Sequence, residues 1–153
     1  MNYWLMKCEP SAYSISDLKR DKKTSWEGVR NYQARNLLRD EIKAGDMALF
    51  YHSNAEPSGV AGLMKIARSG YPDHFAFDSK HKYFDPRSQA DKPVWFMVDV
   101  EFVEQFDEIL PLATIKEDKK LEGIMVAKKG SRLSVQPLSH EHFERICKLA
   151  RHK

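Results

Sequence analysis

The segment VWFMVDVEFV, residues 94–103, carries the clearest strand pattern in the sequence. Its large apolar side chains stand at alternate positions and therefore point to one face of an extended chain. They are Val94, Phe96, Val98, Val100 and Phe102. Asp99 and Glu101 point to the opposite face. The segment is therefore expected to form a strand with one apolar face.

Further strands are predicted on both sides of this segment. They cover residues 2–8, 47–53, 60–68 and 130–138. The segment 47–53, MALFYHS, is apolar on both faces, which is typical of a buried strand in a barrel or a central sheet. Gly62, in the strand that follows, predicts a bend or a close approach of another backbone.

Apolar spacing and capping residues predict four helices. They cover residues 14–21, 31–43, 112–118 and 139 onward. Ser14 and Asp17 match a capping pattern at the start of the first helix. The second helix has a single apolar stripe and a polar opposite face. Ser139 can cap the last helix, and Cys147 lies in its apolar stripe, so this cysteine is expected to act as a small core side chain.

Residues 70–93 combine turn signals with five aromatic side chains. A connection this long in a compact domain is usually functional or partly structured. No repeat, low-complexity tract or linker divides the chain. The sequence therefore predicts one α+β domain over residues 1–153, in which five or six strands form a curled sheet with helices at its ends.

Composition and charge limit the possible functions. The 153 residues are 42% hydrophobic and 31% charged, which are ordinary values for a globular domain. No stretch approaches the roughly 18 apolar residues of a membrane span, and the first residues have no secretion-signal pattern. The net charge of +3 is too small for the protein to bind long nucleic acid by charge alone, although it is compatible with a local basic patch.

The two cysteines, Cys8 and Cys147, lie far apart and lack the spacing of metal ligands. Reduced thiols in a cytoplasmic protein, or in a nuclear one if the source is eukaryotic, are the expected state. No coiled-coil heptad is present, and a monomer is expected.

Enzymatic function is the weaker of the hypotheses that the residues support. The sequence has no nucleophile elbow, phosphate-binding loop, dinucleotide-binding or zinc-protease motif. His52 stands beside Ser53, but neighbours on a strand point to opposite faces and do not easily form a base–nucleophile pair. The other histidines do not converge on a shared point, so neither a metal nor a cofactor is expected.

A binding role has more candidate residues, several of them in WEGVRNYQARN, residues 26–36. The aromatic side chains that could sandwich a flat ring are Trp26, Tyr32, Tyr51 and Tyr83. The polar side chains that could read the edge of that ring are Asn31, His52, Ser53 and Asn54. The basic side chains that could meet phosphates are Arg30, Arg35, Lys128, Lys129 and Arg132. Stacking of a base on an aromatic ring contributes roughly 1–3 kcal/mol, so a few such residues suffice.

Each of these residues also has a structural interpretation. Trp26 at the start of a helix is compatible with a core anchor, and Tyr51 on an apolar strand with a core side chain. His52 on the same strand is by default a buried histidine with a satisfied hydrogen bond. Arg30 and Arg35 are compatible with charges on a solvated helix face. The residues alone favour a binding module over an enzyme by a small margin.

Seven motifs resemble the EVE-domain family, in the same order and over nearly the whole chain. They are YWLMKCEP, WEGVRNYQARN, GDMALFYHSN, GVAGLMKIARSGYPD, YFDPRS, PVWFMVDVEF and GSRLSVQPL. The resemblance implies a PUA-like fold, a small β-barrel flanked by helices, and a single EVE domain. Relatives in that superfamily include the YTH and ASCH domains, which read or process RNA.

The resemblance also implies a function, which is the holding of a flipped, modified base of DNA or RNA, with modified cytosine favoured. Trp26 would form one wall of the pocket, with Val29, Arg30 and Asn31 beside it. The opposite side would be formed by His52, Ser53 and Asn54. The long loop would add Tyr83 and Asp85, and the rim would be completed by Arg132 and Ser134.

Two alternatives to a reader remain open at this point. An enzyme or sensor could use the same pocket for a nucleotide-like or anionic aromatic ligand, and its turnover should then fall with His52→Ala or Asp85→Ala. In a scaffold protein with a vestigial pocket, Trp26→Ala should change the melting temperature and leave ligand binding unaltered.

Overall fold

The fold is built on one six-stranded mixed sheet with the strand order β2-β5-β4-β3-β1-β6. The computed structural model describes residues 1–130 and 132–151. The strands are β1 (Tyr3–Cys8), β2 (Lys23–Trp26), β3 (Met47–His52), β4 (Gly59–Pro72), β5 (Phe96–Pro111) and β6 (Val135–Leu138). β1 and β3 pair in parallel, and the other neighbours are antiparallel. The predicted α+β class and strand number are confirmed.

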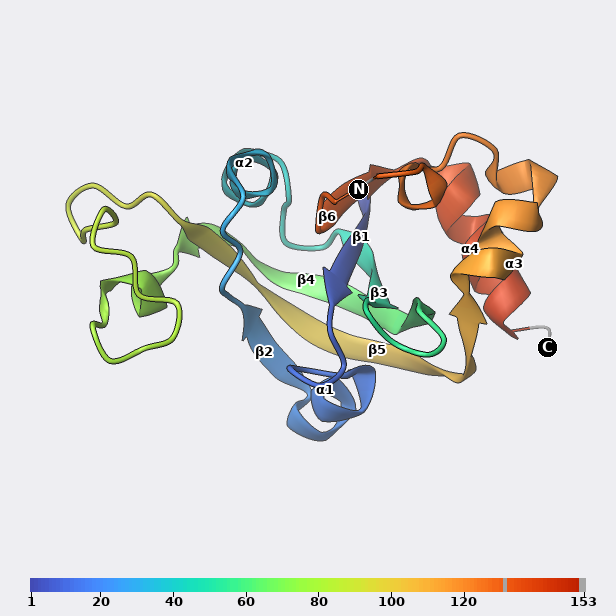
Figure 1. The fold of residues 1–153 in the computed structure, drawn as a ribbon, viewed down its shortest axis with the longest axis horizontal. Coiled ribbons are helices and arrows are strands. Elements are labelled where there is room, and N and C mark those ends of the chain that lie inside the picture. Colours follow the sequence, from blue (N-terminus) through green and yellow to red (C-terminus); the bar gives the residue numbers. More distant parts are fainter. Residues whose placement is uncertain (131, 152–153) are drawn as a thin grey trace.

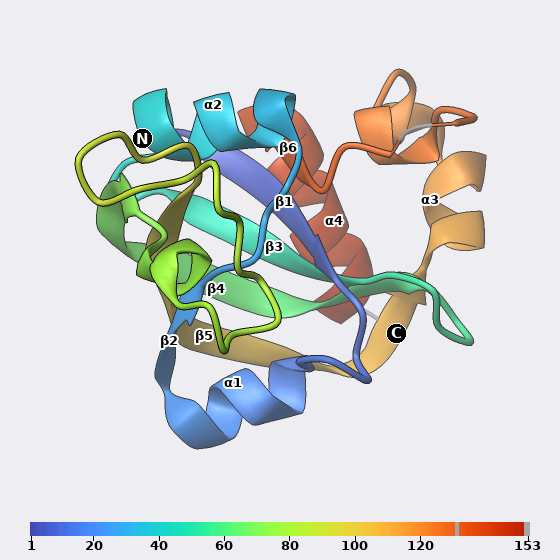
Figure 2. The same ribbon diagram turned by 60° about the vertical axis from the view of Figure 1, so that its left-hand side comes forward.

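The helices lie on the two faces and at one end of this sheet (Figure 1). They are α1 (Ile15–Asp21), α2 (Tyr32–Asp40), α3 (Leu112–Glu117) and α4 (His140–Arg151), and short 3₁₀ turns cover His74–Phe77, Lys119–Leu121 and Met125–Ala127. The connection between β4 and β5 extends from the end of the molecule opposite α3 and α4, and in the second view it passes beside the segment that joins β2 to α2 (Figure 2). None of the helices in the described part of the chain is long and apolar enough to cross a membrane.

β3 separates two apolar clusters because its side chains are buried on both faces, as predicted. Phe50 lies in the cluster covered by α1 and α2, together with Met6 and Trp26. Leu49, its neighbour in sequence, lies in the cluster covered by α3 and α4, together with Ile146. The sheet therefore has a core on each side.

The two long strands β4 and β5 approach each other closely at Gly62, where the sequence predicted a bend or a close approach of another backbone. A Cβ atom on Gly62 would lie 2.4 Å from the carbonyl oxygen of Glu104, so only glycine permits this approach of the two strands. The register shifts on both sides of Gly62. Both strands are longer than the predicted 60–68 and 94–103, because pairing between them continues past the alternating pattern.

Two strand boundaries and the closure of the sheet differ most clearly from the sequence prediction. Lys23–Trp26 forms an edge strand, so Trp26 ends a strand and does not begin a helix. The last strand covers only Val135–Leu138 of the predicted 130–138. Within the described residues the strand pairing leaves β2 and β6 as separate edges, so the sheet is curled but is not a closed barrel.

Candidate functional site

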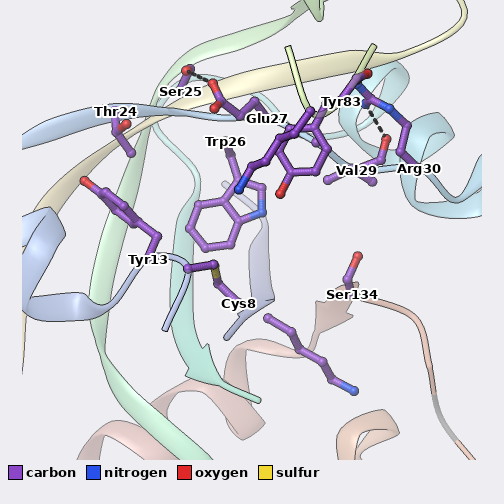
Figure 3. Close-up of a pocket in the computed structure, with 14 residues that line it drawn as sticks. Cys8, Tyr13, Thr24, Ser25, Trp26, Glu27, Val29, Arg30, Tyr83 and Ser134 are labelled. Atoms are coloured by element: carbon purple, nitrogen blue, oxygen red, sulfur yellow. Dashed lines mark hydrogen bonds between the residues drawn. The ribbon is translucent and has the colours of Figure 1, made fainter. Parts of the chain in front are cut away.

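A cavity of about 380 Å³ opens where β2 ends, beside the indole ring of Trp26 (Figure 3). The end of β2 and residues 27–30 form one side of it. Lys7, Cys8 and Tyr13, from β1 and the following turn, and Ser134, just before β6, form other parts of the lining. The connection between β4 and β5 contributes residues 82 and 83. This volume lies near the lower end of the roughly 300–1,000 Å³ that small-ligand pockets occupy.

Trp26 belongs both to the core and to the cavity wall. Its side chain is 7% exposed, and its ring meets that of Phe50 edge-on with the centroids 5.3 Å apart. Figure 3 shows the indole ring between Tyr13, Cys8 and Tyr83. Trp26 is therefore both a core side chain and part of the cavity wall, so both interpretations of this residue hold.

Gly28 allows the ring of Tyr83 to form part of the cavity wall. Its φ of +79° lies in the left-handed region, and a Cβ atom there would lie 2.4 Å from two carbons of the Tyr83 ring. The backbone after Trp26 and the Tyr83 ring are therefore in close contact, although they come from separate segments.

A buried carboxylate, that of Asp73, holds these two segments together. Its side chain is fully buried and accepts hydrogen bonds from the backbone N–H of Gly28 at 3.0 Å and from Nη1 of Arg30 at 3.1 Å. Its other oxygen accepts from the backbone N–H of Phe75 at 3.0 Å. Nη2 of Arg30 also donates to the carbonyl oxygen of Tyr83 at 2.6 Å. Arg30 is thus tied to the wall of the cavity and does not point freely from a helix face.

Five of the residues predicted for the base pocket line this cavity: Trp26, Val29, Arg30, Tyr83 and Ser134. The sequence prediction missed Asp73, Glu27, Lys7, Cys8, Tyr13 and Lys82. Glu27 and Lys82 could have been found as sequence neighbours of Trp26 and Tyr83. The link from Asp73 to Gly28 and Arg30 carries no local signal, because these two partners lie far away in the sequence.

The strand residues predicted for the opposite wall are elsewhere. His52 is buried, and its Nε2 accepts the backbone N–H of Ile15 at 3.1 Å. Burial lowers the pKa of His52, which favours the neutral ring that this hydrogen bond requires. Asn54 donates to the carboxylate of Glu9, and neither Asn54 nor Ser53 lines the cavity. His52 is therefore a satisfied core histidine, and residues 52–54 do not line the cavity beside Trp26.

Asn31 and Arg35 have structural partners as well. The side-chain oxygen of Asn31 accepts the backbone N–H of Ala34 at 2.9 Å and so caps α2. Nη1 of Arg35 donates to the carbonyl oxygen of Val94 at 2.6 Å. Tyr51 is buried in the second core cluster. The predicted rim residues Lys128, Lys129 and Arg132 do not line the cavity.

Tyr32 and Asp85 lie in a second hollow, beside the first and also about 380 Å³ in volume. The two hollows share Arg30, Lys82 and Tyr83. Asp85 accepts Nε1 of Trp95 at 2.7 Å and pairs with Arg87 at 3.0 Å. These two partners hold the pKa of the Asp85 carboxyl well below its usual range. The single pocket of the sequence prediction is therefore two adjoining hollows.

Burial shifts the pKa of titratable groups that line the cavity, and it lowers the pKa of the Lys7 ammonium. Burial raises the pKa of the Cys8 thiol, so it stays protonated near neutral pH. Burial also raises the pKa of Cys147, which lies in the core as expected. Among residues 1–130 and 132–151, no group of three or more His, Cys, Asp or Glu side chains is arranged to hold a metal ion.

Comparison with known proteins places the chain in a family. The EVE domain model matches residues 2–149. Human thymocyte nuclear protein 1 is 45% identical over 97% of this chain and 73% of its own length. The fold is similar to that of a Pseudomonas syringae protein of known crystal structure, with a TM-score of 0.92, 44% identity and coverage of 97% of this chain and 99% of that one.

A further similar structure contains DNA. The crystal structure of human THYN1 protein in complex with 5-methylcytosine-containing DNA has a TM-score of 0.91 and 42% identity to this chain. The match covers 100% of this chain and 99% of that one. The family model, the sequence identity and the shared fold agree over almost the whole length. The chain belongs to the EVE domain family.

Proposed function

We propose that this protein is a non-catalytic reader of DNA that holds a flipped, modified cytosine in the cavity beside Trp26. The observation that carries the proposal is the complex of human THYN1 protein with 5-methylcytosine-containing DNA, since that structure is 42% identical in sequence to this chain and the match covers the whole of this chain. A cavity of about 380 Å³ with aromatic walls supports the same assignment.

The aromatic walls would offset the cost of flipping. Extrusion of a base from a duplex costs a few kcal/mol of unpairing and unstacking. A base between Trp26 and Tyr83 would regain roughly 1–3 kcal/mol for each ring on which it stacks. Both rings are held in place in the free protein, Trp26 by Phe50 and Tyr83 by its contact with Gly28. Little side-chain entropy is therefore lost on binding.

Glu27 is the side chain in the cavity best suited to recognise cytosine. Glu27 lines the cavity, and its carboxylate accepts the hydroxyl of Ser25 at 3.1 Å, which holds it in position (Figure 3). A carboxylate accepts hydrogen bonds and does not donate them when ionised. Cytosine presents an N4 amino donor, whereas thymine presents an O4 acceptor at the same position. Glu27 would therefore favour cytosine over thymine.

Recognition of the methyl group alone can contribute only modestly. Burial of one methyl group is worth about 0.8 kcal/mol, which corresponds to roughly a fourfold preference. Val29 and Ala12 supply apolar atoms to the cavity lining for such a contact. A larger preference would require a close fit that leaves a void next to unmodified cytosine.

The enzyme alternative has less support than the reader. The two residues on which it depended, His52 and Asp85, are both engaged in internal hydrogen bonds, and neither lines the cavity. The cavity offers hydrogen-bonding groups and aromatic ring faces, which are the groups that proteins use to bind a flipped base.

The test compares affinities for oligonucleotides that differ at one base. The strands carry cytosine, 5-methylcytosine, 5-hydroxymethylcytosine or thymine, and each is titrated at two salt concentrations. We expect a modified cytosine to bind most tightly, with thymine well below it although thymine carries the same methyl group. Glu27→Gln should narrow the gap between 5-methylcytosine and thymine by about fivefold, since a hydrogen bond to a charged group is worth about 1 kcal/mol more than a neutral one. Equal affinities that only weaken with salt would contradict the proposal.

A further inference from the structure

The second hollow adjoins the cavity beside Trp26 and has its own aromatic surface. Arg30, Lys82 and Tyr83 form the boundary between the two. Beyond this boundary the second hollow is lined by Tyr32, Phe84, Asp85, Arg87 and Trp95. A strand that placed a base in the first cavity and continued across this boundary would bring its next nucleotide to this surface.

Exposed aromatic side chains are concentrated in this hollow. The large hydrophobic side chains that are exposed in the described part of the chain are Met1, Tyr32, Phe84 and Val103. Both aromatic members of that set line the second hollow, where Tyr32 is 51% exposed and Phe84 is 40% exposed. Clustered apolar surface on a monomeric protein commonly marks an interaction site.

The ring of Tyr32 is already held in the position that a stacking partner needs. One of its faces stacks on Trp95, with the centroids 5.0 Å apart and the rings inclined by 26°. Trp95 is in turn fixed by the hydrogen bond from its Nε1 to Asp85. The guanidinium of Arg35 lies 5.2 Å from the Tyr32 centroid. A rigid ring of this kind can stack on a base with little loss of conformational freedom.

The charges around the hollow suit a phosphate group. Lys82 lies on the boundary between the hollows, is exposed, and has its ammonium 5.0 Å from the Tyr83 centroid. Arg87 remains 67% exposed although it pairs with Asp85. Among the described residues that line the hollow, Asp85 is the one carboxylate, against the three basic side chains Arg30, Lys82 and Arg87. Arg30 is also paired with the buried Asp73, so the surplus positive charge is that of one side chain, and it favours a backbone phosphate near Lys82.

We propose that the second hollow stacks the nucleobase next to the flipped base, on the same strand, against the exposed ring of Tyr32, with the phosphate between the two nucleotides near Lys82. This inference rests on the proposed reader function. A second unstacked base costs a few kcal/mol in a duplex and far less in a single strand. The protein should therefore bind a modified base more tightly in single-stranded DNA than in the interior of a duplex.

The experiment uses single-stranded heptamers with one central 5-methylcytosine, and the same heptamer with unmodified cytosine at that position. In two further probes an abasic residue replaces the nucleotide immediately 5′ or 3′ of the modified base. Affinities are measured for the wild-type protein, for Tyr32→Ala and for Tyr32→Phe, which keeps the ring. Val103→Ala, which removes exposed apolar surface elsewhere, is the control, and melting temperatures establish that every variant is folded.

We expect one of the two abasic probes to bind the wild-type protein roughly 5- to 150-fold more weakly than the intact strand. Tyr32→Ala should weaken binding of the intact strand by a similar factor and remove the abasic effect, because both changes delete the same contact. Tyr32→Phe and Val103→Ala should bind like the wild type. Wild-type affinity in Tyr32→Ala, or no effect of either abasic probe, would overturn the inference.

The two proposals fail in different ways in this experiment. The ratio of affinities for methylated and unmethylated strands depends on the first cavity, so Tyr32→Ala should leave it unchanged. A wild-type protein with no preference for the methylated strand contradicts the proposed function. If removal of the neighbouring base weakens binding only when the Tyr32 ring is present, stacking in the second hollow is supported, whatever the ratio of affinities for methylated and unmethylated strands.

Discussion

A Cβ atom on Gly28 would lie 2.4 Å from two carbon atoms of the Tyr83 ring, so the cavity wall depends on a glycine at this position. Asp73 accepts hydrogen bonds from the backbone N–H of Gly28 and from the guanidinium of Arg30, and Arg30 in turn donates to the carbonyl oxygen of Tyr83, which holds Tyr83 near Gly28. The shape of the cavity is therefore set by contacts between the end of β2 and the connection between β4 and β5. Single substitutions at these contacts should alter the cavity even where they leave the sheet intact.

Gly28→Ala should disturb both stability and binding. Its φ of +79° makes alanine unfavourable by roughly 1–2 kcal/mol, and the new methyl group would displace the Tyr83 ring. Gly123→Ala is the matched control, because Gly123 has a φ of +85° and a Cβ atom added there would meet no described atom within 4 Å. Urea unfolding should show the larger loss for Gly28→Ala, and only that variant should bind methylated DNA more weakly. Equal behaviour of the two variants would contradict the role of the Gly28–Tyr83 contact.

Asp73→Asn should loosen the connection between β4 and β5. The substitution removes the charge that binds Arg30, and a hydrogen bond to a charged group is worth about 1.5–3 kcal/mol. Asp78→Asn is the control, since Asp78 is exposed in the same connection and its side chain accepts a local backbone N–H, that of Lys80. Hydrogen exchange of the Gly28 and Phe75 amides should accelerate in Asp73→Asn and stay unchanged in Asp78→Asn. Unchanged exchange in both variants would show that Asp73 does not hold the segments together.

Acidification should destabilise the protein through His52. Burial lowers the pKa of His52 below its usual 6.5, so the unfolded chain takes up this proton at a higher pH than the folded protein does. The free energy of unfolding should therefore fall as the pH drops from about 6.5 toward the folded-state pKa, and the contribution should be complete above about 6.5.

Urea midpoints near pH 7.5 and pH 5.5 (about two pH units apart, spanning the usual histidine range) measure this contribution. In His52→Gln the difference between the two midpoints should shrink, whereas in His74→Gln, at an exposed position, it should match the wild type. A His52→Gln variant with the full wild-type pH dependence would assign the effect to other groups.

Trp26→Ala should cost about 3–5 kcal/mol of stability, because the side chain is 7% exposed and packs on Phe50. Trp26→Phe should cost less, since it keeps an aromatic ring in the core. Thermal unfolding of both variants tests this, and a Trp26→Ala protein as stable as the wild type would contradict the core role. Binding assays on the alanine variant are informative only at temperatures where it remains folded.

Local sequence patterns predicted those helices and strands whose burial or capping is determined by residues within the same segment. The two apolar faces of β3 and the alternation in β5 determine how these strands are buried. The capping box of α1 is present, with Ser14 accepting the Asp17 N–H at 3.2 Å and Asp17 accepting the Ser14 N–H at 2.9 Å. Gly62 marks a close approach of backbones, as its position inside a strand indicated.

The candidate site was less predictable because its geometry depends on the partner that each polar group finds in the fold. The side chain of Asn31 caps its own helix and that of His52 accepts the N–H of Ile15, although both residue types could equally have faced a ligand. The link from Asp73 to Gly28 and Arg30 has no local pattern, since these two partners are more than forty positions away. β2 is a short edge strand that depends on pairing with β5.

The most direct test of the central claim is the NMR signal of a ¹³C-labelled 5-methyl group on cytosine in a DNA strand bound to the protein. A methylcytosine held beside Trp26 and Tyr83 should show an upfield methyl shift from ring currents and a nuclear Overhauser contact with the indole of Trp26. The shift should decrease in Trp26→Phe, which has a smaller ring. A methyl signal that keeps its free-DNA shift on binding, without contact to Trp26, would contradict base capture in this cavity.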